Sequence, residues 1–396
     1  MKIRLANRVS QVEEYYFSTK LRQIAEMRAS GLDVINLGIG SPDLKPSQLV
    51  IDRLSQEAQQ EDQHGYQSYI GVPELRMAVA DWYQRKFKVT LNPNGEILPL
   101  IGSKEGIMHL SMTYLQPGDQ VLVPNPGYPT YRSAALLAGA EVVHYDLTED
   151  THWMPVIGQL EKMDLSKVRM MWINYPHMPS GATGTPQLFS ELVAFARRNE
   201  ILLCHDNPYA FILNKNPQSI LSVDGAKEVA VELNSLSKTF NMAGWRIGFL
   251  VGDKDRISEV LRFKSNMDSG MFKPLQLAAV EALNQADEWY DRVNDTYQIR
   301  RVLAEKILSA LECTYDAGQV GMFVWARIPD LYADGIALAD QLLEEAHVFI
   351  TPGNIFGNNG NKYIRISLCS KEPVLETALK RIEIWKSNKN KEQTII

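Results

Sequence analysis

The stretch "VRMMWINYPHMPSGATGTPQLFSELVAFARRNEILLCHDNPY", residues 168–209, decides the fold. It begins with the apolar run "VRMMWINY" at 168–175 and ends with the apolar run "ILLCHD" at 201–206. Between them, "PQLFSELVAFARRNE" places Leu188, Leu192 and Phe195 on one face of an amphipathic helix. A strand, a helix and a second strand in this order predict neighbouring parallel strands with the helix covering the sheet.

The same alternation extends in both directions from this stretch. Short apolar runs between about 97 and 252 read as further buried strands: "EILPLIG", "DQVLVP", "AEVVHY", "EVAVELN" and "WRIGFLVG". We therefore predict an α/β protein with a three-layer α/β/α large domain and a mostly parallel sheet.

A second pattern begins near residue 286. A long helix with one apolar stripe is predicted at 286–312, followed by "GMFVWARI", a helix around 335–346, and "KYIRISL". These elements predict a smaller α+β domain, which the N-terminal segment joins because it lacks a strong sheet pattern. The predicted division is a large domain at 46–285 and a small domain formed by 1–45 and 286–396.

The composition favours small molecules or other protein chains as partners. Among 396 residues, 41 Lys plus Arg stand against 47 Asp plus Glu, for a formal net charge of −6. Nucleic-acid binders usually carry a basic stripe, so we expect no nucleic acid as partner. The three cysteines are far apart and fit a reducing compartment. No signal-peptide pattern and no run of about 18 apolar residues occurs, so we expect a soluble, cytoplasmic protein without a membrane partner.

Ligands of open parallel sheets bind beyond the carboxyl ends of the strands, so the residues that follow each strand are the candidates for a site. The first run is followed by "GSKEG" at 102–106, a glycine turn that opens a helix. Free backbone N–H groups and the helix dipole suit a phosphate there, with Ser103 and Lys104 as further donors. The alternative is an ordinary serine N-cap.

Two later segments add aromatic and acidic side chains. "PNPGYPTY" places Tyr128 on a stiff loop, where it either stacks on a ligand or packs on its neighbours. "HDNPY" at 205–209 places Asp206 and Tyr209 after a very apolar strand, where a carboxylate requires a cation or a strong donor unless it serves as a helix cap. No second His or Cys group with ligand spacing accompanies Cys204 and His205, so we predict no metal site.

The segment "SLSKTFNMAGWR", 235–246, contains the candidate nucleophile. Lys238 near cations and low-dielectric walls can lose its proton and attack a carbonyl, and Arg246 suits bidentate binding of phosphate. The "SxxK" pattern also occurs in serine acyl-enzymes. That class requires S-D-N and K-T-G elements as well, and neither occurs in this sequence.

In order and spacing, these residues resemble the fold-type I pyridoxal-phosphate-dependent aminotransferases of class I/II, the aspartate aminotransferase-like enzymes. The resemblance runs from "INLGIGSPD" (35–43) through "GYQSYIGVPELR" (65–76) to "YIRISL" (363–368). Its most specific part is the spacing of Asp206, 32 residues before Lys238, and of Arg246, eight residues after it. It implies an amino-acid:2-oxoacid aminotransferase of the EC 2.6.1 type that uses pyridoxal 5'-phosphate and works by a ping-pong mechanism.

The resemblance also implies a role for each matching residue. Lys238 would hold the cofactor as a Schiff base and then move the proton between Cα and the cofactor. Asp206 would pair with the pyridinium nitrogen, Tyr209 would donate to the ring hydroxyl, and Tyr128 would stack on the ring. The phosphate would be bound by Ser103, Lys104, Ser235, Ser237 and Arg246. Tyr66 would reach the phosphate of a partner subunit, which implies a homodimer with shared active sites.

On the substrate side, the resemblance makes Arg365 the arginine that binds the α-carboxylate. Alternation in "YIRISL" sets Arg365 on the face opposite Ile364 and Ile366. Read without the family, an arginine in such a strand is an exposed residue of an edge strand. Gly40 matches the backbone position that lets the N-terminal segment close over the substrate.

One position departs from the family pattern. The usual N-P-T-G segment, whose asparagine bonds to the cofactor ring oxygen, is here "NYPHMPSG", so Met178 stands in place of the asparagine. A thioether is a weak acceptor and no donor. The ring oxygen then depends on Tyr209 alone or on another donor such as Asn174, and we hypothesise that the acidity of the Schiff base is altered.

Three other classes of protein share some of these features. A C–S/β-lyase or synthase of the same fold shares the lysine, the aspartate and the arginines and therefore stays open. A ligand-sensing domain of a regulator would carry an attached basic DNA-binding segment, for which the chain leaves no room. A nucleotide-binding dehydrogenase would need G-x-G-x-x-G after the first strand, and none occurs. Aspartate, aromatic amino acids, methionine and diaminopimelate all remain candidate donors.

Overall fold

A computed structural model describes residues 3–12, 14 and 16–394 of the chain. A seven-stranded sheet forms its centre, with the strands in the order β2-β8-β7-β6-β5-β3-β4. The strands are β2 (Ile97–Leu100), β3 (Gln120–Asn125), β4 (Glu141–Asp146), β5 (Val168–Ile173), β6 (Leu202–Asp206), β7 (Ala230–Ser235) and β8 (Gly248–Gly252). Every pairing is parallel except those of β8, which runs antiparallel to β2 and β7.

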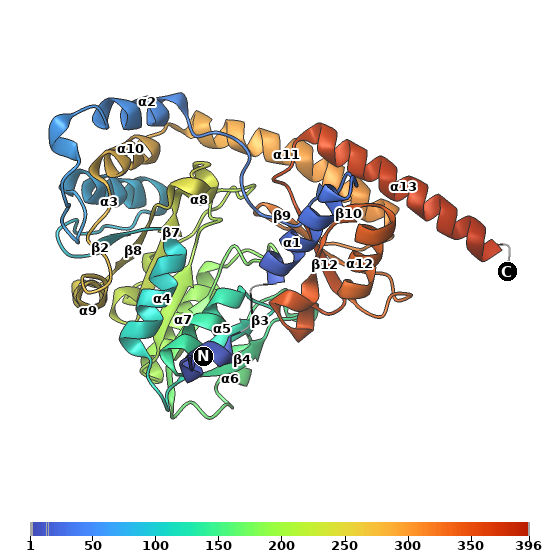
Figure 1. Ribbon diagram of the computed structural model, residues 1–396. Helices are drawn as coiled ribbons and strands as arrows, with labels where there is room; N and C mark the ends of the chain where they lie inside the picture. The colour runs from blue at the N-terminus through green and yellow to red at the C-terminus, as the bar shows by residue number, and fades with distance from the viewer. Residues whose placement is uncertain (1–2, 13, 15, 395–396) are drawn as a thin grey trace.

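Helices cover both faces of this sheet (Figure 1). The helices of this part of the chain are α2 (Gln48–Glu57), α3 (Pro73–Phe87), α4 (Ser103–Tyr114), α5 (Pro129–Ala138), α6 (Ile157–Leu160), α7 (Pro186–Arg198), α8 (Leu236–Thr239), α9 (Lys254–Lys264) and α10 (Lys273–Leu283). Of these, α2 packs on α10, and the short α8 directly follows β7 at the edge of the sheet. In β5, Met171 and Ile173 join the apolar cluster that contains side chains of α3, α7 and α10, whereas Met170 and Trp172 join the cluster with α4, α5 and α9. Burial on both faces explains why the strand reads as a continuous apolar run, and the predicted three-layer α/β/α class is confirmed.

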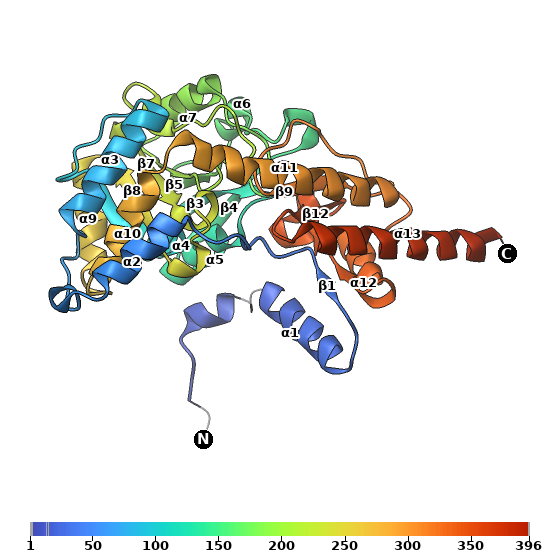
Figure 2. The ribbon, with the colours of Figure 1, turned by 90° about the horizontal axis from the view of Figure 1, so that it is seen from above.

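A second group of elements lies beside the large sheet (Figures 1 and 2). It contains the three-stranded antiparallel sheet β11-β12-β9, made of β9 (Phe323–Arg327), β11 (Thr351–Pro352) and β12 (Tyr363–Ser367). It also contains helices α1 (Tyr16–Ala29), α11 (Asp287–Ala310), α12 (Gly335–Glu345) and α13 (Glu372–Thr394). In Figure 2, α1 lies near β1, and α11 runs from the region of the large sheet toward this group.

The N-terminal and C-terminal parts of the chain meet in a short parallel pair. Strand β1 (Ile35–Asn36) pairs with β10 (Val348–Phe349), with Ile35 opposite Val348. This pair holds the segment after β1, which contains Gly38 and Gly40, against the C-terminal elements. The predicted domain boundaries at 46 and 286 stay a prediction. Among the helices of the described residues, none is both long enough and apolar enough to span a membrane.

Candidate active site

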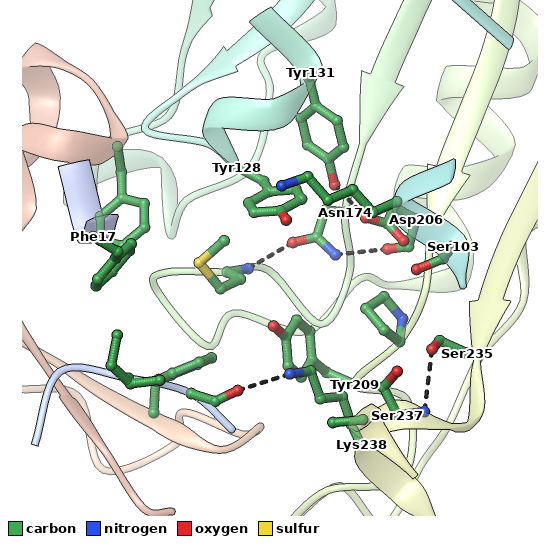
Figure 3. A pocket seen from close by; sticks show the side chains of 18 of the residues that line it. Phe17, Ser103, Tyr128, Tyr131, Asn174, Asp206, Tyr209, Ser235, Ser237 and Lys238 are labelled. Atoms are coloured by element: carbon green, nitrogen blue, oxygen red, sulfur yellow. Dashed lines mark hydrogen bonds between the residues drawn. The ribbon is translucent and has the colours of Figure 1, made fainter. Parts of the chain in front are cut away.

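A cavity of about 490 Å³ opens where the strands of the large sheet end. Its lining brings together eleven of the twelve residues that the sequence analysis selected: Gly40, Ser103, Lys104, Tyr128, Asp206, Tyr209, Ser235, Ser237, Lys238, Arg246 and Arg365. Figure 3 shows side chains from several elements converging on this space. The twelfth residue, Tyr66, is 94% exposed and lies outside the cavity of its own chain, so its predicted contact with a partner subunit stays a prediction.

One end of the cavity is rich in hydrogen-bond donors and cations. Gly102, at φ +85°, caps the start of α4, and a Cβ atom there would lie 2.1 Å from Nη2 of Arg246. Any other residue would be strained at this φ and would also displace the guanidinium from the helix N-terminus. Burial, followed by the charge of Arg246, lowers the pKa of Lys104. Both causes favour the neutral amine, and an anion bound between Lys104 and Arg246 would favour the charged form.

The segment between β7 and β8 completes this end. The Ser235 hydroxyl accepts a hydrogen bond from the Ser237 backbone N–H at 3.1 Å, at the start of α8. Ser235 also lies opposite Gly248 in the antiparallel pairing of β7 with β8, so the return of β8 brings Arg246 back beside the serines. Arg246 itself has the left-handed φ of +57°, a conformation that a non-glycine residue rarely adopts and that often occurs at functional sites.

Asp206 lies at the end of β6 with 4% of its surface exposed. The Tyr131 hydroxyl donates to its Oδ2 at 2.8 Å, whereas Oδ1 is buried without a hydrogen-bond partner among the described residues. Burial raises the pKa of this carboxyl to about 6, against the opposing effects of the Tyr131 hydrogen bond and the charges of His205 and Lys238. A buried carboxylate oxygen that faces a cavity without a donor requires a ligand with an N–H or O–H group.

Lys238 stands across the cavity from Asp206, on the short helix α8 (Figure 3). Its Nζ donates to the backbone oxygen of Gly40 at 2.8 Å. Burial lowers its pKa, and the charges of Arg365 and Arg246 act in the same direction, although Cys369 and Asp206 oppose them. A larger fraction of neutral amine makes this lysine a better nucleophile.

Two tyrosines lie on the walls between these ends. Tyr128 precedes α5 and packs edge-on against Tyr131, with ring centroids 5.5 Å apart. Tyr209 packs edge-on against Phe323 at 5.8 Å, and burial raises the pKa of its hydroxyl. The Tyr209 hydroxyl therefore stays protonated and can serve as a donor.

Arg365 is 4% exposed and lies deep in the cavity wall. Its Nη2 donates to the Gly38 oxygen at 2.8 Å, and its Cζ lies 3.9 Å from the ring centroid of Phe323. The alternative of an exposed arginine on an edge strand is wrong, because β12 is the central strand of its sheet and has β9 and β11 on either side.

Met178 stands beside this arginine. Nη1 of Arg365 lies 3.2 Å from the Met178 sulfur. The Asn174 side chain accepts from the Met178 backbone N–H at 2.8 Å and donates to the Asp206 backbone oxygen at 2.6 Å. The Asn174 amide thus joins two backbone segments, and its NH₂ group, which the sequence analysis considered as a substitute donor to the ring oxygen, is engaged by a carbonyl.

The chain contains ionisable groups outside the cavity as well. His205, next to Asp206, points away from it: its ring nitrogens lie 2.9 Å from Glu232 Oε2 and 2.9 Å from the Tyr175 oxygen. Within the described residues one cluster could offer three metal ligands, namely Glu105, His109 and Asp268. Asp268 is already paired with Lys264 Nζ at 2.7 Å, so its charge is compensated by a side chain.

Sequence reasoning missed several residues of the lining. These are Phe17, Ile39, Tyr131, Phe323 and Phe356. Tyr131 carried a signal, because it follows Tyr128 by three positions and therefore lies near it at the start of one helix. Ile39 carried one too, because it directly precedes Gly40. Phe17, Phe323 and Phe356 come from segments far apart in the chain, and nothing in their local sequence marks them as neighbours.

Comparison with known proteins relates this geometry to one family. The family model described as "Aminotransferase class I and II" matches residues 32–382. An LL-diaminopimelate aminotransferase of Dehalococcoides mccartyi is 39% identical and covers 98% of this chain and 100% of its own. One from Moorella thermoacetica is 40% identical, with 95% and 97% covered. The substrate-bound structure of BacF from Bacillus subtilis is 36% identical, with a TM-score of 0.92 and 98% of each chain covered.

Proposed function

Because the chain belongs to the class I and II aminotransferases, we propose that it moves an amino group from an amino acid to a 2-oxoacid. Pyridoxal 5'-phosphate would bind in the cavity around Lys238. The family is pyridoxal-phosphate-dependent. The observation that carries the proposal for this chain is the buried, unpartnered Oδ1 of Asp206, which requires a donor such as a protonated ring nitrogen.

The residues present fit this cofactor at each of its functional groups. The donor-rich end formed by Ser103, Lys104, Ser235, Ser237 and Arg246 suits the phosphate dianion. Asp206 would hold the ring nitrogen, Tyr128 the face of the ring, and Tyr209 the ring hydroxyl. The Lys238 amine would bind the aldehyde carbon.

Bound pyridoxal phosphate supplies an electrophilic carbon and a ring that withdraws electrons from the substrate Cα. Lys238 would take the proton from that Cα, because its lowered pKa leaves more of the amine neutral. Asp206 would keep a proton on the ring nitrogen, since a buried carboxylate is stabilised by a neighbouring positive charge.

Arg365 would bind the substrate α-carboxylate. Two features support this role: the guanidinium is buried in the cavity wall, and its stacking on the Phe323 ring fixes its plane. Gly40 packs against the Phe323 ring, because a Cβ there would lie 2.3 Å from its Cζ, and its backbone oxygen accepts from Lys238 Nζ, so its backbone would lie beside the substrate near Lys238. Together these contacts orient the amino acid with its Cα–H toward Lys238.

We propose further that the enzyme is a homodimer in which Tyr66 of one chain completes the site of the other. We also propose that the enzyme acts in the cytoplasm, where its three buried thiols would stay reduced. A mixing experiment tests the shared site. Tyr66→Ala and Lys238→Ala should each be impaired alone, whereas a hybrid dimer has one intact site of two and should regain about half of the wild-type activity, or about a quarter for an equal mixture in which half of the dimers are hybrids. No recovery in verified hybrids would show that each chain carries a complete site.

The reaction is tested with purified holoenzyme and its visible absorbance. An amino acid alone should bleach the cofactor absorbance, and addition of 2-oxoglutarate or pyruvate should restore it together with formation of the corresponding amino acid. A lyase of the same fold would instead turn over continuously without an oxoacid and release ammonia. Steady ammonia release without bleaching would therefore refute the transaminase assignment.

A further inference from the structure

A pair of fully buried ionisable side chains lies next to Asp206, where β6 and β7 run side by side. His205 precedes Asp206 in β6, and Glu232 is its partner in the parallel pairing of the two strands. Both side chains are 0% exposed. Because successive side chains of a strand point to opposite faces, His205 and Asp206 lie on opposite faces of the sheet. The proposed function uses Asp206 but has given no task to this pair.

The hydrogen bonds of His205 determine where its protons lie. Nε2 lies 2.9 Å from the Tyr175 backbone oxygen, and Nδ1 lies 2.9 Å from Glu232 Oε2. A carbonyl oxygen can only accept, so Nε2 carries a hydrogen. Nδ1 also faces an oxygen, and one further proton therefore lies between the imidazole and the carboxyl group. The Phe189 ring of α7 packs against the imidazole, with ring centroids 5.1 Å apart.

The surroundings of Glu232 favour its carboxylate form. The Ser219 hydroxyl and the Ile220 backbone N–H donate to Oε2 at 2.8 and 3.0 Å. The Tyr83 hydroxyl of α3 donates to Oε1 at 2.7 Å. A carboxylate that accepts several hydrogen bonds is stabilised in its charged form. The shared proton then belongs to His205, whose ring is an imidazolium beside the carboxylate.

The charge of His205 acts on Asp206. Burial raises the pKa of the Asp206 carboxyl, whereas the Tyr131 hydrogen bond and the charges of His205 and Lys238 lower it. Lys238 stands across the cavity and takes part in the proposed reaction. The charge of His205 is instead held in the core by Glu232, and it stays in place while the groups in the cavity react.

We propose that His205 and Glu232 are positioning residues whose buried ion pair keeps Asp206 a carboxylate, so that the proton between Asp206 and the cofactor stays on the ring nitrogen. The inference rests on the proposed function, because it concerns the nitrogen that Asp206 would hold. A carboxylate at Asp206 lies next to the imidazolium, with the protonated nitrogen farther away, and this order of charges is attractive. A neutral carboxyl beside a neutral nitrogen lacks that attraction. Since a protonated ring withdraws electrons more strongly, the pair acts on the chemistry through Asp206.

The experiment uses holoenzyme that carries pyridoxal phosphate labelled with ¹⁵N in its ring, because the nitrogen NMR shift separates protonated from neutral rings. The nitrogen of wild type should be protonated at pH 7.5. His205→Asn keeps a donor toward Glu232 near the position of Nδ1 but carries no charge, and Glu232→Gln removes the anion that holds the imidazolium. In both variants the ratio of neutral to protonated ring nitrogen should rise by about 10-fold.

Tyr83→Phe is the matched control. It removes a hydrogen bond from Glu232 but leaves both charges of the pair in place, so its ratio should be that of wild type. If Tyr83→Phe raises the ratio as much as His205→Asn does, the network has a structural role only and the inference is overturned.

The outcomes separate the inference from the proposed function. If wild type binds no pyridoxal phosphate, or binds it with a neutral ring nitrogen, the proposed function fails, because Asp206 then does not hold a protonated nitrogen. If wild type shows a protonated nitrogen and folded His205→Asn and Glu232→Gln show the same ratio, the proposed function stands and the inference is wrong.

A measurement on the cofactor-free wild type needs neither variant. In protein with ¹⁵N-labelled histidine, one ring should have both nitrogens protonated at pH 7.5, and its N–H protons should exchange slowly with water because the ring is buried. A spectrum without such a ring would show that the ion pair does not form, whether or not the variants fold.

Discussion

Asp206→Asn should stabilise the cofactor-free protein at neutral pH while it impairs the enzyme. The carboxyl has its pKa raised from the usual 3.8 to about 6, mainly by burial. At 1.36 kcal/mol per pH unit, the carboxylate destabilises the cofactor-free fold by about 3 kcal/mol above pH 6. Asparagine removes the charge and can still accept from Tyr131, but its NH₂ group would lack an acceptor, which costs about 1 kcal/mol. The net gain is about 2 kcal/mol.

The pH dependence follows from the direction of the shift. Because the folded pKa lies above the unfolded one, the folded protein binds the extra proton between about pH 4 and pH 6, and stability falls as the pH rises through that window. Below pH 4 the carboxyl is protonated in both states, so only the cost of the unpaired NH₂ group remains and Asp206→Asn should be less stable than wild type by about 1 kcal/mol. Above pH 6 the advantage should be constant.

The assay is calorimetric melting of protein from which bound pyridoxal phosphate has been removed, at several pH values between 4 and 7.5. With an unfolding entropy of about 2.1 cal/mol/K per residue, a gain of 2 kcal/mol raises Tm by about 2 °C for a chain of this length. Asp268→Asn is the matched control with the opposite sign. Asp268 is paired with Lys264, which lowers its pKa against the effect of burial, and its loss should lower Tm at neutral pH. If Tm of Asp206→Asn at pH 7.5 is below that of wild type, or if the difference in Tm between the two does not change with pH, the buried carboxylate does not destabilise the cofactor-free fold.

The other predictions concern single residues of the site and its surroundings. Lys238→Ala should abolish turnover, because the proposed nucleophile and Cα proton acceptor are lost; transaminase activity above one thousandth of wild type in a donor–acceptor assay would contradict the proposed role. Arg365→Ala should raise KM for every amino acid by roughly 100-fold, since the α-carboxylate is common to all, and an effect confined to one donor would rule out this contact. Met178→Asn should shift the spectrophotometric pH titration of the bound cofactor, and titration curves that coincide with wild type would disprove an effect of the thioether. Burial lowers the pKa of His177 to about 4, so as the pH falls this histidine is protonated in the unfolded chain at a higher pH than in the folded protein. The free energy of unfolding should then fall by about 3 kcal/mol as the pH drops from 6.5 to 4, and His177→Gln should make Tm less dependent on pH in that range. An equal pH dependence of Tm in the variant would contradict the lowered pKa.

The sequence predicted the large sheet well because burial on both faces leaves a simple pattern. Strands β2, β3, β5, β6 and β8 coincide with largely apolar runs, whereas the edge strand β4 is mostly exposed and β7 contains the buried Glu232. The polar residues that follow β2, β6 and β7 gather at one edge, where they line the cavity. Sequence alone could not give the strand order, and it therefore could not show that β8 runs antiparallel and brings Arg246 back to Ser235.

The apolar half of the cavity was not predictable for a related reason. Phe17, Phe323 and Phe356 come from an N-terminal helix, a strand and a short 3-10 helix, and each would look like an ordinary core residue in its own segment. The burial of Arg365 depends on the position of β12 between two other strands, which a single alternating pattern does not reveal. Long-range pairing, and not local preference, decided these features.

The pairing of β1 with β10 has a consequence for the synthesis of the protein. The seven-stranded sheet is complete once residue 252 has been made, and by then the chain contains Asp206, Lys238 and Arg246. Ile35, however, cannot form its strand pairing until Val348, 313 positions later, has been synthesised. At translation rates of about 5–20 residues per second, this wait lasts roughly 16 to 60 s. On the proposed assignment, a nascent chain can bind its cofactor before it can bind an amino acid, and early loading stabilises the emerging sheet while the segment at Gly38 and Gly40 still lacks its neighbour.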